Sequence, residues 1–165
     1  MPFLAFLAAA TAAATLVPEA VAAPTIPAEG TQGFVRVPAS ELEWVEWPGS
    51  HGAKSAVVLG DPSKPGVYII RQKFPPYWMD TPHWHSADRY ITVLEGVWYT
   101  GTGSFDMNKA VALPAGSVMV HPHDGVHWDG SGDSHGTTVE VIGMGPVTNT
   151  FVDPKAPIWI NVARP

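Results

Sequence analysis

The chain has 165 residues, of which 45% are hydrophobic and 15% are charged, so it can build one domain with a substantial core but not two. The formal net charge of −6 and the lack of any cluster of Lys and Arg exclude a nucleic-acid backbone as the expected partner, because phosphate binding needs a basic surface. The absence of cysteine excludes disulfides, so the core alone must hold the fold together.

Residues 1–23 differ from everything that follows. They contain an uncharged, Ala-rich apolar run, and the small residues at 20–23 resemble a signal cleavage site. The run is short for a membrane span, and Pro18 and Glu19 interrupt it. We expect a signal peptide over 1–23, an exported protein (periplasmic or secreted), and no stable membrane insertion after signal removal. A retained N-terminal anchor is the alternative.

Residues 24–35 are a Pro-rich entry segment, and we expect the folded domain to span 36–165. Short alternating or β-branched segments follow at regular spacing, with Gly and Pro between them and no convincing amphipathic helix. We count around ten strands, among them 34–37, 42–47, 56–59, 67–74, 97–100, 111–113, 117–121, 137–142, 151–152 and 158–162. This pattern predicts an all-β sandwich, jelly roll or barrel.

The segment with the clearest chemistry begins at His83 and His85, which stand one residue apart and lead into a β-branched run that ends at Gly96. Side chains alternate faces along a strand, so the two imidazoles point the same way, about 6–7 Å apart. They can converge on one metal ion or one proton-transfer site. A pair of this kind also occurs by chance on solvated loops, so its meaning depends on the rest of the chain.

A second signal begins at Pro114-Ala115-Gly116 and continues through Pro122 to His127. A hairpin over this stretch would carry a third imidazole back toward the face of the first two. Three histidines are a common open metal site, because they leave coordination positions for water or substrate.

Together, the two stretches resemble the two conserved motifs of the cupins, residues 83–96 the first and residues 114–127 the second. The likeness extends over most of residues 40–155, toward small, single-domain, often exported bacterial cupins. The resemblance implies a cupin-type double-stranded β-helix, a single-domain jelly-roll barrel with its site inside.

Cupins usually bind a divalent metal through two His and one Glu of the first motif and one His of the second. The matching residues here are His83, His85 and His127, and we expect them to be the metal ligands. The Glu position is occupied by Arg89. A guanidinium offers no lone pair to a metal and repels a dication at short range.

Three outcomes stay open. In the first outcome, a three-His site survives, with Arg89 turned away or paired to Asp88, Asp124 or Glu95.

In the second outcome, another residue replaces the lost carboxylate. His121, His123 and Asp124 are close enough in sequence to line the site. In the third, the metal is gone and Arg89 binds an anionic substrate group, for which its bidentate geometry is suited.

Two further expectations concern acidic residues. Asp80, Asp88 and Asp124 could serve as proton carriers, but acidic residues beside Pro and Gly form turns more often. The pair Glu95-Gly96 is expected where the chain turns between two strands, with Glu95 exposed.

The sequence therefore predicts a metal-binding cupin, an enzyme of dioxygenase, isomerase or lyase type that acts on a small, anionic organic molecule in the barrel. The expected cofactor is a divalent transition metal, Fe, Mn, Ni or Zn, and Arg89 is the expected catalytic residue that orients the anionic group. The alternatives are a non-catalytic exported cupin that binds a small ligand or sugar, and a metal-free cupin that uses Arg89 and a histidine for acid–base chemistry. We expect a homodimer.

Overall fold

The computed structural model describes residues 33–163, so the expected signal peptide and all but the last residues of the 24–35 entry segment lie outside the described residues. Twelve strands and two 3₁₀ helices, η1 (Ala39–Glu41) and η2 (Met107–Lys109), make up the regular structure of this range. Across residues 33–163, no helix is long and apolar enough to cross a bilayer.

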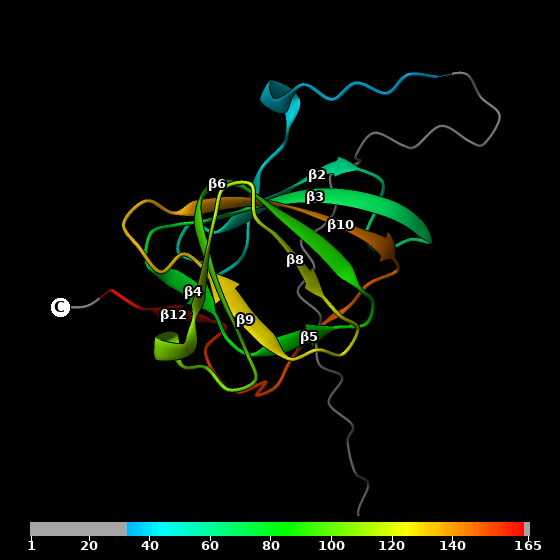
Figure 1. The fold of residues 1–165 in the computed structure, drawn as a ribbon. Helices are drawn as coiled ribbons and strands as arrows, with labels where there is room; N and C mark the ends of the chain where they lie inside the picture. The colour runs from blue at the N-terminus through cyan, green and yellow to red at the C-terminus, as the bar shows by residue number, and fades with distance from the viewer. Residues whose placement is uncertain (1–32, 164–165) are drawn as a thin grey trace, which may run out of the picture.

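The strands form two antiparallel layers that face each other (Figure 1). The first layer has the order β1–β2–β3–β10–β6–β8. The second has the order β7–β6–β9–β4–β12, with β5 between β9 and β11. The strands are β1 (Val45–Glu46), β2 (Lys54–Leu59), β3 (Gly66–Phe74), β4 (Trp78–Asp80), β5 (His83–His85), β6 (Arg89–Thr102), β7 (Val111–Pro114), β8 (Val118–His121), β9 (His127–Gly130), β10 (Thr137–Gly145), β11 (Asn149–Phe151) and β12 (Trp159–Asn161).

Strand β6 belongs to both layers. Its first half pairs with β8 and β10, and its second half pairs with β7 and β9. Gly96 has φ +71°, a backbone conformation that favours glycine, and the register with β10 shifts beside it. The expected turn at Glu95-Gly96 is therefore wrong, because a glycine at an irregularity bends this strand from one sheet into the other without ending it.

The strand expected over 34–37 is also absent. Residues 33–38 have no regular structure, and Phe34 is 88% exposed. Alternating apolar residues make a strand only where a neighbouring strand and a buried face are available to them. This segment finds neither.

The core lies between the layers and consists of Tyr68, Phe74, Ile91, Val93, Trp98, Val139 and Val141. On β6 the alternation is clear, because Ile91 is fully buried whereas Tyr90 is 52% exposed. Arg89 has the same parity as Ile91 and is itself buried, with 8% exposure. The inward face of β6 therefore carries a cation into the core.

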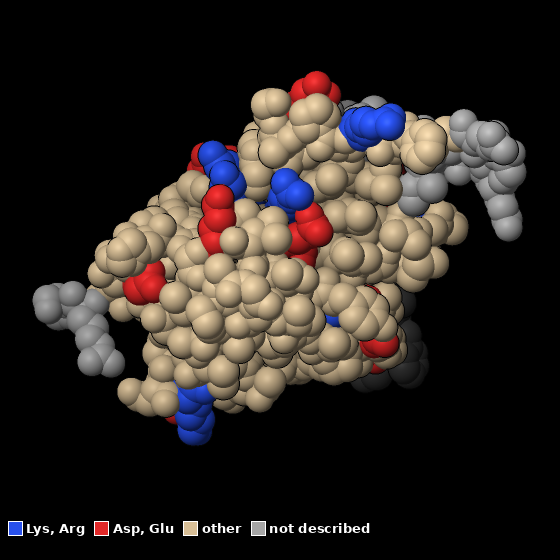
Figure 2. Space-filling view, turned by 45° about the horizontal axis from the view of Figure 1, so that its top comes forward, with Lys and Arg blue, Asp and Glu red and all other residues tan. Residues whose placement is uncertain are grey.

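The charged groups of the surface are distributed differently. On the face shown in Figure 2, acidic and basic side chains lie next to each other, and most of the surface is uncharged. Two of the surface ion pairs are Lys64–Asp61 at 2.8 Å and Arg71–Glu140 at 2.9 Å. Arg89 differs from these cations in being enclosed by the two sheets.

The close approach of β6 and β9 gives a first prediction. Gly101 lies opposite Trp128, and a Cβ atom on Gly101 would lie 2.0 Å from the Trp128 ring. We expect Gly101→Ala to lower the free energy of unfolding by about 1–3 kcal/mol, because the fully buried indole has to shift. Urea unfolding followed by circular dichroism measures this change.

The matched control is Thr102→Ala at the next, exposed position, which should change stability by no more than about 0.5 kcal/mol. Equal stabilities of the wild type and Gly101→Ala would contradict the packing of Trp128 against β6.

Candidate metal centre

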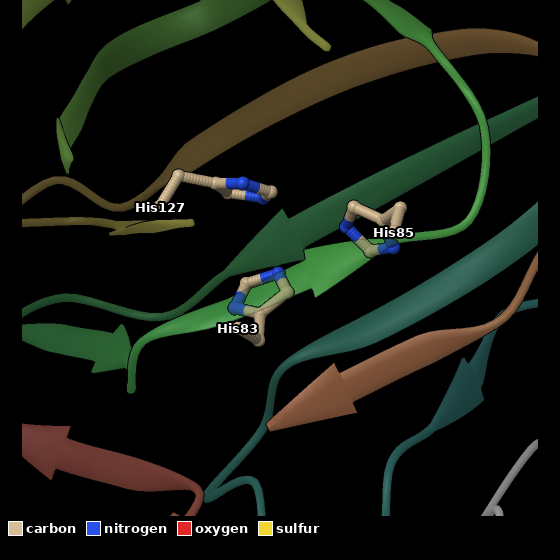
Figure 3. Close-up of side chains that lie close together, drawn as sticks. All are labelled: His83, His85 and His127. Atoms are coloured by element: carbon tan, nitrogen blue, oxygen red, sulfur yellow. The ribbon is translucent and has the colours of Figure 1, made fainter. Parts of the chain in front are cut away.

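His83, His85 and His127 come together between β5 and β9 (Figure 3). His83 and His127 are direct cross-strand partners, with ring centroids 4.3 Å apart, and the His85 ring lies 5.1 Å from that of His127. The three side chains are 2–4% exposed, and each offers a ring nitrogen within 4.8 Å of the others. The fold thus brings the three histidines of the two sequence motifs into one buried group.

Backbone carbonyls orient two of these rings. Nδ1 of His83 lies 2.9 Å from the Thr81 carbonyl oxygen, and Nδ1 of His127 lies 2.7 Å from that of Gly125. A carbonyl oxygen only accepts, so each Nδ1 carries the proton and each Nε2 keeps its lone pair. A hydrogen bond of this kind from the second ring nitrogen is typical of metal-ligating histidines. Both Nε2 atoms are therefore suited to a metal.

Burial also keeps these rings neutral, as a ligand must be. Burial, with a contribution from the neighbouring His127, lowers the pKa of His83 to about 3. Burial lowers the pKa of His127 to about 4, although its hydrogen bond to Gly125 acts in the opposite direction. Burial and the adjacent Arg89 cation lower the pKa of His85.

Arg89 is hydrogen-bonded to His85, the third histidine of the group. Its Nη1 lies 3.1 Å from Nδ1 of His85 and also contacts Nε2 of the same ring. A neutral imidazole has one nitrogen with a lone pair, and a guanidinium only donates, so Arg89 occupies the lone pair of His85. Its Nε is buried and has no hydrogen-bond partner among residues 33–163. Arg89 thus points into the group and holds one of its expected ligands.

The expected carboxylate partners of Arg89 are engaged elsewhere. Asp88 accepts a hydrogen bond from the His123 backbone N–H at 2.7 Å, and Glu95 accepts one from the Thr138 hydroxyl. Asp124 lies 3.3 Å from the His123 ring. None of these carboxylates is paired with Arg89 in the part of the chain that the structure describes.

The three additional site candidates separate in the structure. His121 is buried on β8, directly opposite Arg89 on β6, and its ring centroid lies 3.6 Å from that of His127. The side chains of His123 and Asp124 are 58% and 56% exposed. Only His121 therefore joins the buried group.

A buried carboxylate that the sequence analysis missed completes the group. Asp129, on β9, has an Oδ2 atom 4.0 Å from Nε2 of both His121 and His127. Its Oδ1 accepts a hydrogen bond from the Trp98 indole at 3.2 Å. The spacing could have revealed it, because a residue two positions after His127 on a strand shares its face.

Asp80 is the second buried carboxylate, and the expectation of a turn role for it is wrong. It lies on β4, where its Oδ1 accepts the Asp129 backbone N–H at 2.7 Å. Burial raises the pKa of Asp129 to about 6 against the opposing effect of Arg89, and burial followed by the Asp129 charge raises the pKa of Asp80. The nearby proline in the sequence could not reveal that Asp80 is buried, because its burial depends on β9 and β12 packing beside β4.

Comparisons with known proteins address the fold. No protein-family model and no curated protein sequence matches the chain. The structure is similar to an RmlC-like cupin protein from Ralstonia eutropha (TM-score 0.59, 19% identity, 79% of this chain and 80% of that one). It is also similar to the polyketide cyclase RemF from Streptomyces resistomycificus (TM-score 0.59, 20% identity, 73% of this chain and 88% of that one). A third similar structure is KdgF from a Halomonas species (TM-score 0.55, 18% identity, 68% of this chain and 96% of that one).

These likenesses, together with the two antiparallel layers, confirm that the chain has the cupin fold predicted from its two motifs. At identities of 20% or less they establish the fold alone. What the site does has to be argued from its own residues.

The buried imidazoles give a prediction for the dependence of stability on pH. Lowering the pH from 7 to 5 should reduce the free energy of unfolding of the metal-free protein. Four buried histidines have lowered pKa values, so the unfolded chain, with histidines near pKa 6.5, takes up protons that the folded chain excludes. Each proton that the unfolded chain binds and the folded chain does not bind lowers the free energy of unfolding by about 1.4 kcal/mol per pH unit.

The raised pKa values of Asp129 and Asp80 act in the opposite direction, because the folded protein binds those protons, but two carboxyl groups offset only part of four imidazoles. Urea unfolding at several pH values in the presence of a chelator measures the slope. The exposed His135 provides the control, since His135→Gln should leave the slope unchanged. A stability that does not vary between pH 7 and 5 would contradict the burial of neutral imidazoles.

Proposed function

We propose that this cupin-fold protein is a metal-dependent enzyme that acts on a small anionic organic molecule inside the barrel. The observation that carries the proposal is the buried group of imidazoles around His127, whose Nδ1–H is fixed by the Gly125 carbonyl oxygen so that its Nε2 lone pair remains available. Neutral, buried imidazoles in this orientation are suited to a divalent transition metal such as Fe, Mn, Ni or Zn.

The group offers more than one set of ligands. His83, His85 and His127 form one set, and His121, His127 and Asp129 form another, with His127 common to both. A divalent ion bound here would supply Lewis-acid or redox chemistry, consistent with an isomerase, lyase or dioxygenase reaction. Among similar solved structures, RemF is named as a polyketide cyclase, which supports an enzymatic use of this fold.

Arg89 gives the site its preference for an anion. Its guanidinium is buried on the inward face of β6, and its Nε has no hydrogen-bond partner among the described residues. A carboxylate is the natural ligand for an arginine with an unused donor, because it accepts charge-assisted hydrogen bonds. Arg89 therefore binds and orients the anionic group, while its contact with His85 fixes the guanidinium in the barrel.

A metal-free reaction is the second candidate, and one observation favours it. The carboxyl group of Asp129, whose pKa burial raises to about 6, belongs to the same buried group as Arg89 and His121, so the chain itself contains an acid–base group near neutral pH. In that case Arg89 binds the anion and Asp129 or a histidine transfers the proton. A non-catalytic binding protein is the remaining outcome.

Metal content is the first test. We expect the tag-free protein, reconstituted with Fe(II), Mn(II), Ni(II) or Zn(II), to retain about one equivalent after desalting, because the cluster provides at least three neutral or anionic ligands. Elemental analysis measures the metal, and removal by a chelator should lower the Tm. Retention of less than about a tenth of an equivalent of every metal would exclude the metal-dependent enzyme. A turnover screen with aromatic and keto acids then separates an enzyme from a binding protein.

Anion binding is the second test. We expect millimolar concentrations of small carboxylates to raise the Tm of the wild type but not of Arg89→Met, which keeps an unbranched apolar stem and removes the donors. Arg71→Met is the matched control, because Arg71 is paired with Glu140 and is not a member of the buried group. An equal shift in the wild type and Arg89→Met would show that Arg89 does not bind the anion.

A further inference from the structure

His121 is an imidazole without an evident partner. Its side chain is 1% exposed, and neither ring nitrogen has a hydrogen-bond partner among residues 33–163. The buried Nε2 of His127, whose ring lies 3.6 Å from that of His121, has no partner either. Buried polar atoms are nearly always hydrogen-bonded, so three orphaned nitrogens in one place indicate a missing ligand.

Asp129 points to the identity of that ligand. Its Oδ2 lies 4.0 Å from Nε2 of both His121 and His127, which is too far for a hydrogen bond. Two donors that bind one ion at about 2.1 Å each are at most about 4.2 Å apart, so these atoms can share an ion with little movement. The Trp98 indole holds Oδ1 of the same carboxylate, which leaves Oδ2 directed at the imidazoles.

The set of His83, His85 and His127 is a less favourable metal site for two reasons. The lone pair of His85 accepts a hydrogen bond from Arg89, so His85 could bind a metal only after that contact breaks. The His83, His85 and His127 set also carries no negative charge to balance a dication beside the guanidinium.

We propose that His121, His127 and Asp129 are the metal ligands of this protein, with Asp129 supplying the carboxylate that the first motif lost at Arg89. Two histidines and one carboxylate leave coordination positions open, a geometry typical of non-haem iron and related centres. His85 is then not a ligand but the group that holds Arg89 in place beside the ion. This inference rests on the proposed function, because it specifies how the proposed metal is bound.

The affinity of the metal-free protein for Co(II), measured by spectroscopic titration, tests the ligand set. We expect Asp129→Asn and His121→Leu to lower the affinity at least about 100-fold, because each removes a direct ligand. His85→Gln should lower it less than about five-fold. His123→Leu, at an exposed histidine on the same segment, is the matched control for His121→Leu and should leave the affinity unchanged.

A second measurement does not depend on variants. X-ray absorption of the wild-type Co(II) protein counts the imidazoles bound to the ion, and we expect two, with the remaining ligands being oxygen. Three bound imidazoles and no loss of affinity in Asp129→Asn would overturn the proposed set.

Folding is checked on the metal-free variants. His121→Leu removes two orphaned polar atoms and keeps a similar volume, so the Tm without metal should be equal to or above that of the wild type. A lower Tm together with unchanged Co(II) affinity would assign His121 to the core and overturn its role as a ligand. If Asp129→Asn fails to fold, His121→Leu and the absorption spectrum decide the question.

The two proposals fail in different ways. If the wild type binds none of the transition metals, both the metal-dependent function and this ligand set are wrong. If the wild type binds metal and His85→Gln abolishes binding while His121→Leu does not, only the ligand set is wrong and the proposed function stands.

Discussion

The burial of one guanidinium inside the barrel is the constraint on which the site depends. Arg89 stands on the inward face of β6 because strand alternation gives it the parity of the core residue Ile91. A cation in that place lowers the pKa of the histidines around it and opposes the rise in the pKa of the buried carboxyl group of Asp129. Burial is the larger cause of the neutral imidazoles, and the charge of Arg89 adds to it while it favours the ionised form of Asp129.

The orientation of the imidazoles comes from the backbone. His83 and His127 each donate from Nδ1 to the carbonyl oxygen two residues earlier, that of Thr81 in one case and of Gly125 in the other. Because the two residues are cross-strand partners, the repeated local geometry brings both Nε2 atoms to the same side. These two hydrogen bonds leave the Nε2 lone pair of each ring free of a proton.

The continuous strand β6 links this local geometry to the opposite sheet. Its first half places Arg89 beside His121 of β8, and its second half pairs with β9, which carries His127 and Asp129. Gly96 allows the strand to pass from one sheet to the other. The set His121, His127 and Asp129 therefore combines two sheets, because His121 lies in the first layer and the other two residues lie in the second.

By itself, the sequence determined the cupin fold, through its two motifs, and the common inward face of His83 and His85, because side-chain alternation along a strand is local. It did not reveal that Arg89 binds His85, or that His121 and Asp129 approach His127. Those contacts join residues on different strands, and they depend on how the two sheets pack face to face. Strand periodicity says which side chains point inward, and only the tertiary structure decides which of them meet.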